Sequence, residues 1–234
     1  MNMTTTSMDI ETARHNMIEQ QIRTWEVLDQ SVLDLLEVVK REEFVPADWR
    51  RLAFVDMEIP LKIDIGNGVI YDSGQLMFTP KVEARFLQEL AIRPHERVLE
   101  VGTGSGYMAA LTAHKAQHVL SIEIDEKLHR FGGGNLARAG VRNVSVELGD
   151  GARGWAARAP YDVIIVSGAL PALPTELLAQ LKIGGRLSVI VGSAPAMSAQ
   201  IVTRLSESSY DTLKIFETNV KVLRNAWQPS TFQF

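Results

Sequence analysis

Short apolar runs recur along the second half of the chain, and each is closed by a glycine or an acidic residue. An apolar run of about four to eight residues between turn signals is typical of a strand that is buried on both faces. The runs with this pattern are residues 97–101, 119–123, 144–148, 161–168 and 187–191. Segments compatible with helices lie between them. This alternation predicts an α/β fold with a Rossmann-like, doubly wound and mostly parallel sheet.

The first half of the chain has a different pattern. Residues 11–24 and 32–41 carry apolar side chains at helical spacing, whereas residues 52–80 combine alternating apolar positions with glycine and proline. These patterns predict N-terminal helices followed by a small accessory β or loop element. We therefore expect three parts: a disordered lead over 1–8, the helices and accessory element over 9–80, and a core over 81–234 with a C-terminal strand and tail.

Two segments of the expected core are less regular. Gly132-Gly133-Gly134 falls where the helix after the second strand is expected. Because each glycine costs about 1 kcal/mol relative to alanine in a helix interior, we expect a broken or mobile helix there. In the tail we expect an antiparallel strand over 213–221. The aromatic side chains that follow it either pack against the core, which we expect, or form part of an interface; they are Trp227, Phe232 and Phe234.

A glycine-rich loop follows the first buried strand and carries most of the chemical information. It reads Gly102-Thr103-Gly104-Ser105-Gly106, with Glu100 two residues before it. The spacing G-x-G-x-G departs from the dinucleotide fingerprint G-x-G-x-x-G, and the chain has no G-K-[ST] phosphate loop. A carboxylate at Glu100 would repel a pyrophosphate and suits a cationic ligand. S-adenosylmethionine carries a sulfonium and an ammonium group and no phosphate, so the loop predicts this cofactor.

Acidic residues also close the next two strands. Glu123 lies about 20 residues beyond the glycine loop, where such folds bind ribose hydroxyls. Asp150 closes the third strand at a position that suits the adenine amino group. This order of elements is that of a class I S-adenosylmethionine-dependent methyltransferase. The candidate cofactor-binding residues are Glu100, Gly102, Thr103, Gly104, Ser105, Gly106, Glu123, Ile124, Asp150, Gly151 and Ser167.

Composition narrows the class of protein further. A formal net charge of −4 and a pI near 5.8 argue against a general nucleic-acid binder. No apolar run approaches the ~18 residues of a membrane span, and the polar start lacks the pattern of a secretory signal. His114 and His118 are four residues apart without a third ligand nearby, which favours a solvated helix end over a metal site. We therefore expect a cytoplasmic enzyme without metal, nucleic-acid or membrane partners.

Specific motifs spread along the chain resemble one known family. They are Arg41-Glu42-Glu43-Phe44-Val45-Pro46, the loop from Glu100 to Tyr107, Gly149-Asp150-Gly151-Ala152-Arg153-Gly154-Trp155, and Gln180-Leu181-Lys182-Ile183-Gly184-Gly185-Arg186. Glycine loops occur in many methyltransferases, but the first and third motifs together are much more specific. Over nearly its whole length the chain is similar to the protein-L-isoaspartate O-methyltransferase family.

The resemblance implies methyl transfer from S-adenosylmethionine to the α-carboxylate of an isoaspartyl residue, a step in repairing aged proteins. The implied partner is an isoaspartyl-containing protein or peptide. A carboxylate with a reference pKa of ~4 is already ionised at pH 7, so no acid/base pair is needed. The enzyme must align the reacting atoms, exclude water and hold the carboxylate with hydrogen-bond donors.

The chain departs from the family where those donors are expected. The family segment resembles G-Q-T-I-S-x-P, with threonine and serine hydroxyls at the methyl-transfer site, whereas this chain has Leu76 and Phe78 at those positions. Thr79 carries a hydroxyl one residue later, which in a regular strand would face the opposite side. Thr79 is therefore the candidate catalytic residue if the local backbone is irregular.

These departures leave alternatives open. Leu76 and Phe78 either fill the core or reshape the pocket. A reshaped pocket would favour a different carboxylate or a small-molecule substrate, or a cofactor-binding homologue without activity. The C-terminal segment differs as well, because the family has a V-R-F-V-P-L-like strand where this chain has Val220-Lys221-Val222-Leu223-Arg224-Asn225.

Overall fold

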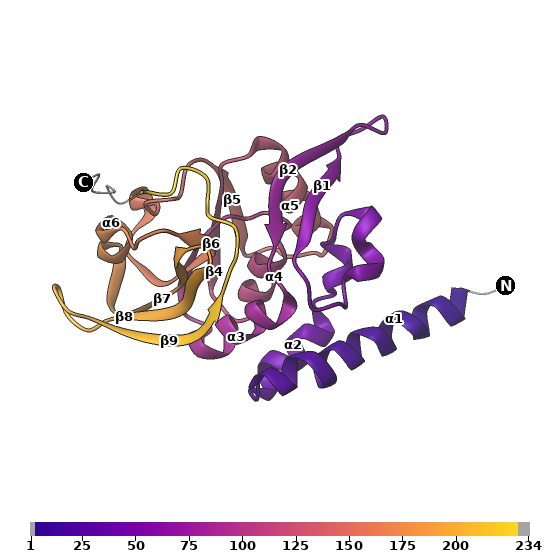
Figure 1. Cartoon of the computed structure of the whole chain (residues 1–234), viewed down its shortest axis with the longest axis horizontal. Coiled ribbons are helices and arrows are strands. Elements are labelled where there is room, and N and C mark those ends of the chain that lie inside the picture. Colours follow the sequence, from indigo (N-terminus) through magenta and orange to yellow (C-terminus); the bar gives the residue numbers. More distant parts are fainter. Residues whose placement is uncertain (1–2, 229–234) are drawn as a thin grey trace. The chain divides into compact units, whose positions relative to one another are not determined.

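The computed structural model describes residues 3–228, together with the side chains from residue 9 onward. The chain forms two compact units, Met1–Ala91 and Ile92–Phe234, and Figure 1 shows their elements. The sequence placed the division at residues 80 and 81. The difference arises because helix α3 (Pro80–Leu90) packs on α2 (Gln30–Val38) of the first unit.

The C-terminal unit is built on a sheet whose described strands follow the order β5-β4-β3-β6-β7-β8-β9. The first five strands of this order run parallel, and β8 and β9 add to the edge in antiparallel pairs. Their bounds are β3 (Arg97–Val101), β4 (His118–Glu123), β5 (Val144–Leu148), β6 (Tyr161–Leu170), β7 (Leu181–Ser193), β8 (Ala196–Arg204) and β9 (Tyr210–Thr218). The predicted mostly parallel, Rossmann-like sheet is confirmed.

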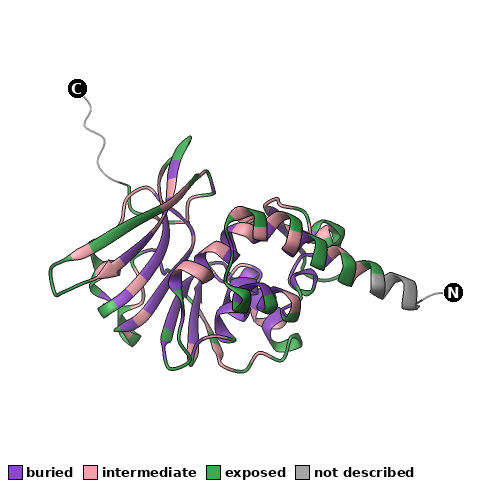
Figure 2. Ribbon diagram, turned by 90° about the horizontal axis from the view of Figure 1, so that it is seen from below, coloured by how far each residue is buried: buried purple, intermediate pink, exposed green. Residues whose placement is uncertain are grey.

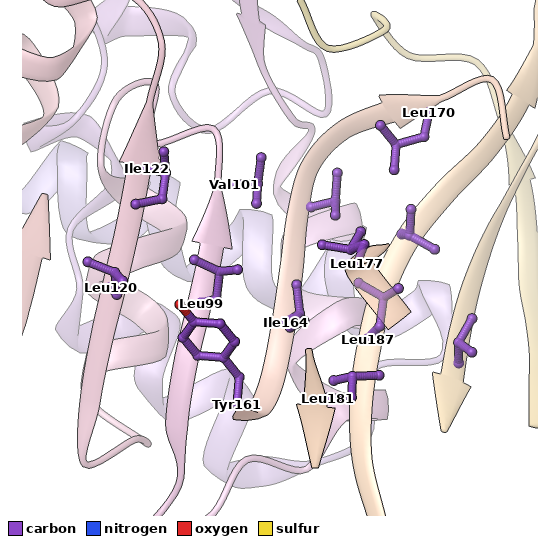
Figure 3. Close-up of a cluster of buried hydrophobic side chains, with 13 residues drawn as sticks. Leu99, Val101, Leu120, Ile122, Tyr161, Ile164, Leu170, Leu177, Leu181 and Leu187 are labelled. Carbon is purple, nitrogen blue, oxygen red and sulfur yellow. The ribbon is translucent and has the colours of Figure 1, made fainter. Parts of the chain in front are cut away.

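Apolar side chains of the parallel strands form the core of this unit. Figure 3 shows leucine, isoleucine and valine side chains from β3, β4, β6 and β7 meeting on one face of the sheet, beside Leu177 of α6 (Thr175–Ala179). Strand β6 is almost continuously buried, as its unbroken apolar run predicts. Figure 2 shows the buried residues concentrated along the strands.

Two helices contact β4 and β5: α4 (Tyr107–Ala113) and α5 (Glu126–Arg138). The Asp125 side chain caps α5 by accepting hydrogen bonds from the N–H groups of Lys127 and Leu128. Helix α5 runs without interruption through Gly132–Gly134, so the expected break there is wrong. The cap and the buried side chains of Leu128 and Leu136 hold the helix in place. A short turn, η5 (Ala156–Arg158), precedes β6.

The N-terminal unit begins with α1 (Met3–Met17), continued by a π-helical turn η1 (Ile18–Ile22) and a 3₁₀ turn η2 (Arg23–Trp25). Residues 3–8 therefore lie in a helix and not in the expected disordered lead, because helix propagation adds one hydrogen bond per residue to an established helix. After α2 come two further 3₁₀ turns, η3 (Arg41–Glu43) and η4 (Ala47–Leu52). The predicted accessory element is an antiparallel hairpin of β1 (Ile59–Asp64) and β2 (Ile70–Met77).

The C-terminal tail only partly matches expectation. Strand β9 is antiparallel to β8, as predicted, but it spans Tyr210–Thr218. Trp227 is 42% exposed, which contradicts the expected packing against the core. Phe232 and Phe234 lie outside the described residues. Within the part of the chain that is described, no helix is long and apolar enough to cross a bilayer.

Two buried ion pairs organise the N-terminal unit around the R-E-x-F-V-P motif. Arg41 is completely buried and pairs with Glu83 of α3, while Glu42 pairs with Arg14 of α1. Arg41 also donates a hydrogen bond of 2.6 Å from Nη2 to the carbonyl oxygen of Phe78. The motif therefore fixes both the start of α3 and the backbone just before it. Removing one partner of a buried pair typically costs about 3–5 kcal/mol, because the other charge is left buried.

Burial raises the pKa of the Glu83 carboxyl to about 7, although the Arg41 guanidinium acts in the opposite direction. Between pH 4.5 and 7 the folded state thus holds a proton that the unfolded chain has released. We predict that the free energy of unfolding falls as pH rises through this window, by up to about 3 kcal/mol. Urea titrations of wild type and Glu83→Gln at pH 5 and pH 8 measure this, and the variant should lose most of the pH dependence.

The control is Glu89→Gln, which removes a carboxylate from the same helix at its Arg85 ion pair. It should keep the wild-type pH dependence. Equal pH dependence in wild type and Glu83→Gln would show that this carboxyl does not titrate in the window.

Candidate active site

The glycine loop connects β3 to α4 in a conformation that glycine readily adopts. The φ angles of Gly102, Gly104 and Gly106 are +95°, +51° and +83°. Residues other than glycine rarely adopt such positive φ angles, so these positions require glycine. The loop is closed by hydrogen bonds from Gly102 N to Ile122 O at 2.8 Å and from Gly106 N to Thr103 O at 2.7 Å. The backbone is therefore held close to the carboxyl ends of β3 and β4.

The Glu100 carboxylate is buried directly before this loop, at 1% exposure. It accepts hydrogen bonds from Ser121 Oγ at 2.6 Å and from Ser167 Oγ at 3.1 Å. Thr103 Oγ1 lies 2.6 Å from Ser121 Oγ and extends the network into the loop. One carboxylate thus ties together the ends of β3, β4 and β6. The sequence predicted Glu100, Thr103 and Ser167 for the site but missed Ser121, which lies inside an apolar run.

Glu123 closes β4 as predicted, and both of its oxygens contact backbone. Oε2 accepts from Gly104 N at 2.8 Å, and Oε1 accepts from Asp125 N at 3.0 Å. Burial raises the pKa of this carboxyl, while the backbone hydrogen bonds act in the opposite direction. An ionised carboxylate has about four acceptor positions, so Glu123 retains capacity for ribose hydroxyls while it holds the loop. The ribose contact stays a prediction, as does a contact from the neighbouring Ile124.

The G-D-G-x-x-G-W motif forms a compact turn after β5. A Cβ added to Gly149 would lie 2.5 Å from the ring of Trp155, and one added to Gly154 would lie 2.4 Å from the Gln180 side chain. At Gly151 an added Cβ would lie 2.9 Å from Val101 Cγ1, so the turn packs tightly against β3. Each glycine of the motif is therefore a close-packing position.

Asp150 is exposed in this turn, as is Arg153. Its Oδ1 accepts from Ala152 N at 3.0 Å, which fixes the direction of the carboxylate. Trp155 Nε1 donates to Glu147 at 3.0 Å and holds the indole across the turn. The motif thus presents one oriented carboxylate at the end of β5, as a contact to an adenine amino group would require.

Helix α5 holds the glycine loop from the other side. A Cβ on Gly132 would lie 2.8 Å from Gly104 O and 2.9 Å from Thr103 Cγ2. Asn135 Nδ2 donates to Ser105 O at 2.8 Å. No function for the glycine triplet could be predicted from the sequence. In the structure, its first residue lets the helix approach the loop backbone.

The structure brings the predicted cofactor residues of three adjacent strands to one edge of the sheet. Glu100, Glu123 and Asp150 stand at or near the carboxyl ends of β3, β4 and β5. The strand order reverses between β3 and β6, and ligands of such sheets bind outside the carboxyl ends at this switch point. Three acidic side chains at this edge are compatible with S-adenosylmethionine, whose sulfonium, amino and hydroxyl groups can interact with carboxylates.

The segment that departs from the family motif lies in the N-terminal unit. The register between β1 and β2 shifts around Gly74, whose φ is +66°, so the alternation of the strand is irregular. Leu76 is half-buried opposite Pro60. Phe78 is buried, and its ring meets Phe86 edge-on with centroids 6.4 Å apart. Phe78 therefore fills the core of this unit.

Thr79 follows β2 and precedes α3. It occupies the N-cap position of α3, yet its side chain makes no capping hydrogen bond. Within the described part of the chain, Thr79 Oγ1 is buried and has no hydrogen-bond partner. Since Thr79 lies beyond the end of β2, strand alternation does not decide where its hydroxyl points.

The two histidines do not share a helix. His114 ends α4, whereas His118 begins β4 and approaches Ser145 Oγ at 3.0 Å. Over residues 3–228, no cluster of three metal-ligating side chains is found.

Comparison with known proteins gives a consistent result. The family model for protein-L-isoaspartate(D-aspartate) O-methyltransferase (PCMT) matches residues 12–222. A protein-L-isoaspartate O-methyltransferase 2 of Anaeromyxobacter sp. (strain Fw109-5) is 40% identical over 85% of this chain and 77% of its own length. A protein-L-isoaspartate O-methyltransferase of Methanoculleus marisnigri is 41% identical over 76% of this chain and 77% of its own length.

Solved structures share the fold. A protein-L-isoaspartate O-methyltransferase matches 90% of this chain with a TM-score of 0.74 and 24% identity, and the match spans 65% of that protein. A Plasmodium falciparum structure in complex with S-adenosyl-L-homocysteine matches 90% of this chain and 98% of its own length, with a TM-score of 0.72 and 18% identity.

The contact between α5 and the glycine loop gives a matched pair of variants. Gly132→Ala should force the loop backbone to move and weaken cofactor binding at least about tenfold, because the added methyl group would overlap Gly104 O. Gly133→Ala meets open space and should leave binding unchanged, while stabilising the helix by up to about 1 kcal/mol. Calorimetric titration with S-adenosylhomocysteine and thermal unfolding measure both effects. Equal affinities in the two variants would refute the packing argument.

Proposed function

This chain belongs to the protein-L-isoaspartate(D-aspartate) O-methyltransferase family, and on that premise we propose that it methylates the α-carboxylate of isoaspartyl residues in damaged proteins. It is an S-adenosylmethionine-dependent methyltransferase, as the family match implies. The proposal concerns the acceptor, the residue that holds it, and the cytoplasmic location expected from the sequence.

The cofactor supplies a methyl group activated by the positively charged sulfur. The chain must supply the rest. Glu100 and Glu123 place negative charge on the side of the glycine loop where the cofactor's cations and ribose are expected. Asp150 offers the oriented carboxylate for the adenine amino group. These residues would bind and orient the cofactor, and none of them needs to move a proton for a carboxylate acceptor to react.

The observation that carries the acceptor proposal is the unpartnered hydroxyl of Thr79. Threonine at an N-cap normally accepts a backbone hydrogen bond, and a buried hydroxyl without a partner costs about 1–3 kcal/mol. The Thr79 hydroxyl makes no capping hydrogen bond in α3, and it has no other hydrogen-bond partner among the described residues. A hydroxyl left free in this way can donate to a bound carboxylate, and the positive end of the α3 dipole would favour the same anion.

Arg41 supports this arrangement. Its guanidinium holds Phe78 O, so the backbone that carries Thr79 is anchored to the buried ion pair with Glu83. A fixed backbone limits the entropy lost when the hydroxyl and the carboxylate are aligned.

A second candidate function follows from Leu76 and Phe78. Two hydroxyls implied by the family motif are absent here, and their loss favours an acceptor that needs fewer donors, such as a different carboxylate or a small molecule. A protein that binds the cofactor without transferring methyl is the limiting case.

The deciding experiment is methyl transfer from labelled S-adenosylmethionine to an isoaspartyl peptide and to the same peptide with normal aspartate. Selective labelling of the isoaspartyl peptide is expected. Absence of labelling by a protein that binds the cofactor would overturn the acceptor proposal and favour the second candidate.

The variants Thr79→Val and Thr79→Ser test whether the Thr79 hydroxyl donates a hydrogen bond to the acceptor carboxylate. Removing a hydrogen bond to a charged group costs about 1.5–3 kcal/mol, so Thr79→Val should lower kcat/KM for the isoaspartyl peptide roughly 10- to 100-fold. Thr79→Ser keeps the hydroxyl and should retain most activity. Both variants should bind S-adenosylhomocysteine like wild type. Wild-type activity in Thr79→Val would show that the Thr79 hydroxyl does not contribute to the reaction.

A further inference from the structure

After β9, residues 220–226 return to the carboxyl edge of the sheet and run past the cofactor-binding loops. Ala169 N donates to Lys221 O at 3.0 Å, and Leu223 N donates to Ala169 O at 2.9 Å. These bonds form a short parallel bridge between Val222 and the end of β6. In Figure 1 the segment belongs to the thin yellow coil that follows the β9 arrow. We call residues 220–226 the strap.

The strap lies at the switch point of the sheet. Strand β6 pairs with β3 only as far as Val101 and Val166, and it pairs with β7 at Ala169. The strap therefore takes the edge of β6 that β3 leaves open where β3 ends. This is the crevice in which an open α/β sheet binds its ligand.

An apolar side chain anchors the strap in this crevice. Leu223 fits against Gly168, where an added Cβ would lie only 2.5 Å from Leu223 Cδ2. The same methyl carbon lies 3.6 Å from the Cβ position of Gly102, the first residue of the cofactor loop. Leu223 of the strap therefore lies next to Gly102 and fills the space that a side chain at this position would need.

Two polar side chains clasp the strap to the loops after β4 and β5. Arg224 Nη1 lies 2.8 Å from Asp125 Oδ2, in an ion pair whose carboxylate is 5% exposed. Asn225 Nδ2 donates to Asp150 Oδ2 at 3.1 Å. Asp125 caps α5, and Asp150 is the carboxylate expected at the adenine. Both clasps thus attach to elements that shape the cofactor site.

We propose that the strap gates the cofactor site: it closes over the crevice through Leu223, Arg224 and Asn225, and it opens for S-adenosylmethionine to enter and S-adenosylhomocysteine to leave. The proposal rests on the cofactor alone and holds for any methyl acceptor. The Arg224 side chain is 37% exposed, and the hydrogen bond between Asn225 and Asp150 lies at the surface. Both contacts can therefore break and re-form on the timescale of turnover.

Stopped-flow binding of S-adenosylhomocysteine to the full chain tests the gate without any methyl acceptor, so the result does not depend on the proposed substrate. The Arg224→Ala/Asn225→Ala double variant should release S-adenosylhomocysteine about tenfold faster and also bind it faster, because the open state is more populated. The control is Arg130→Ala, which removes a surface ion pair with Glu126 on α5 and should behave like wild type.

Either of two results would overturn the proposal. Rates in the double variant equal to those of Arg130→Ala would mean that the clasps do not hold the gate. Faster release with unchanged association would mean that the strap is a fixed wall.

A reversible lock provides a second test. The chain contains no cysteine, so Ala169→Cys/Val222→Cys introduces the only two thiols. Bridge partners on adjacent strands lie about 4.8 Å apart, within the range for a disulfide. Oxidation should slow both association and release of S-adenosylhomocysteine at least about tenfold, and reduction should restore them. Equal rates in the oxidised and reduced protein would refute the gate.

Discussion

The cofactor edge of the sheet depends on one buried acidic side chain, that of Glu100. A polar group in the interior is tolerated only when hydrogen-bond partners replace water. Ser121 and Ser167 are those partners, and they come from the strands on either side of β3. The requirement to satisfy this carboxylate therefore fixes the ends of three strands relative to one another. It also places an acidic side chain directly before the glycine loop.

The glycine loop is held by contacts that need small residues or backbone groups. Glu123 binds the N–H of Gly104, Asn135 binds the carbonyl of Ser105, and Gly132 allows the helix to touch the loop. These contacts are all made within the chain. A loop held by such contacts loses less entropy when it binds a ligand.

In the N-terminal unit, buried polar side chains are satisfied by an ion pair. Arg41 is buried with Glu83, and its remaining donor capacity reaches the backbone of Phe78. Phe78, which replaces a hydroxyl implied by the family motif, packs on Phe86 in the core. The loss of that hydroxyl is therefore accommodated by packing, while the next residue, Thr79, keeps a hydroxyl without a partner.

Local pattern was sufficient for the sheet and for the acidic residues at the carboxyl ends of its strands. The apolar runs, and the carboxylates that close them, predicted the strands. Such a prediction is possible because a strand that is buried on both faces is a run of consecutive apolar residues. Contacts between distant segments were not predictable in this way. Ser121 is hidden in an apolar run, and the value of Gly132 depends on what lies opposite it. The apolar spacing did not predict where α1 begins. It also did not predict where the first unit ends, because α3 belongs to that unit through its packing on α2.

The sequence by itself determined the fold class, the family and the cofactor, since each rests on residue types at fixed spacing. Tertiary structure alone decided that Phe78 belongs to the core, that Thr79 Oγ1 has no hydrogen-bond partner among the described residues, and that residues 220–226 lie in the crevice of the sheet. The last of these depends on Ala169, a residue of β6 that is tens of positions away. The free energy of such contacts arises from burial and hydrogen bonding that only the folded chain brings together.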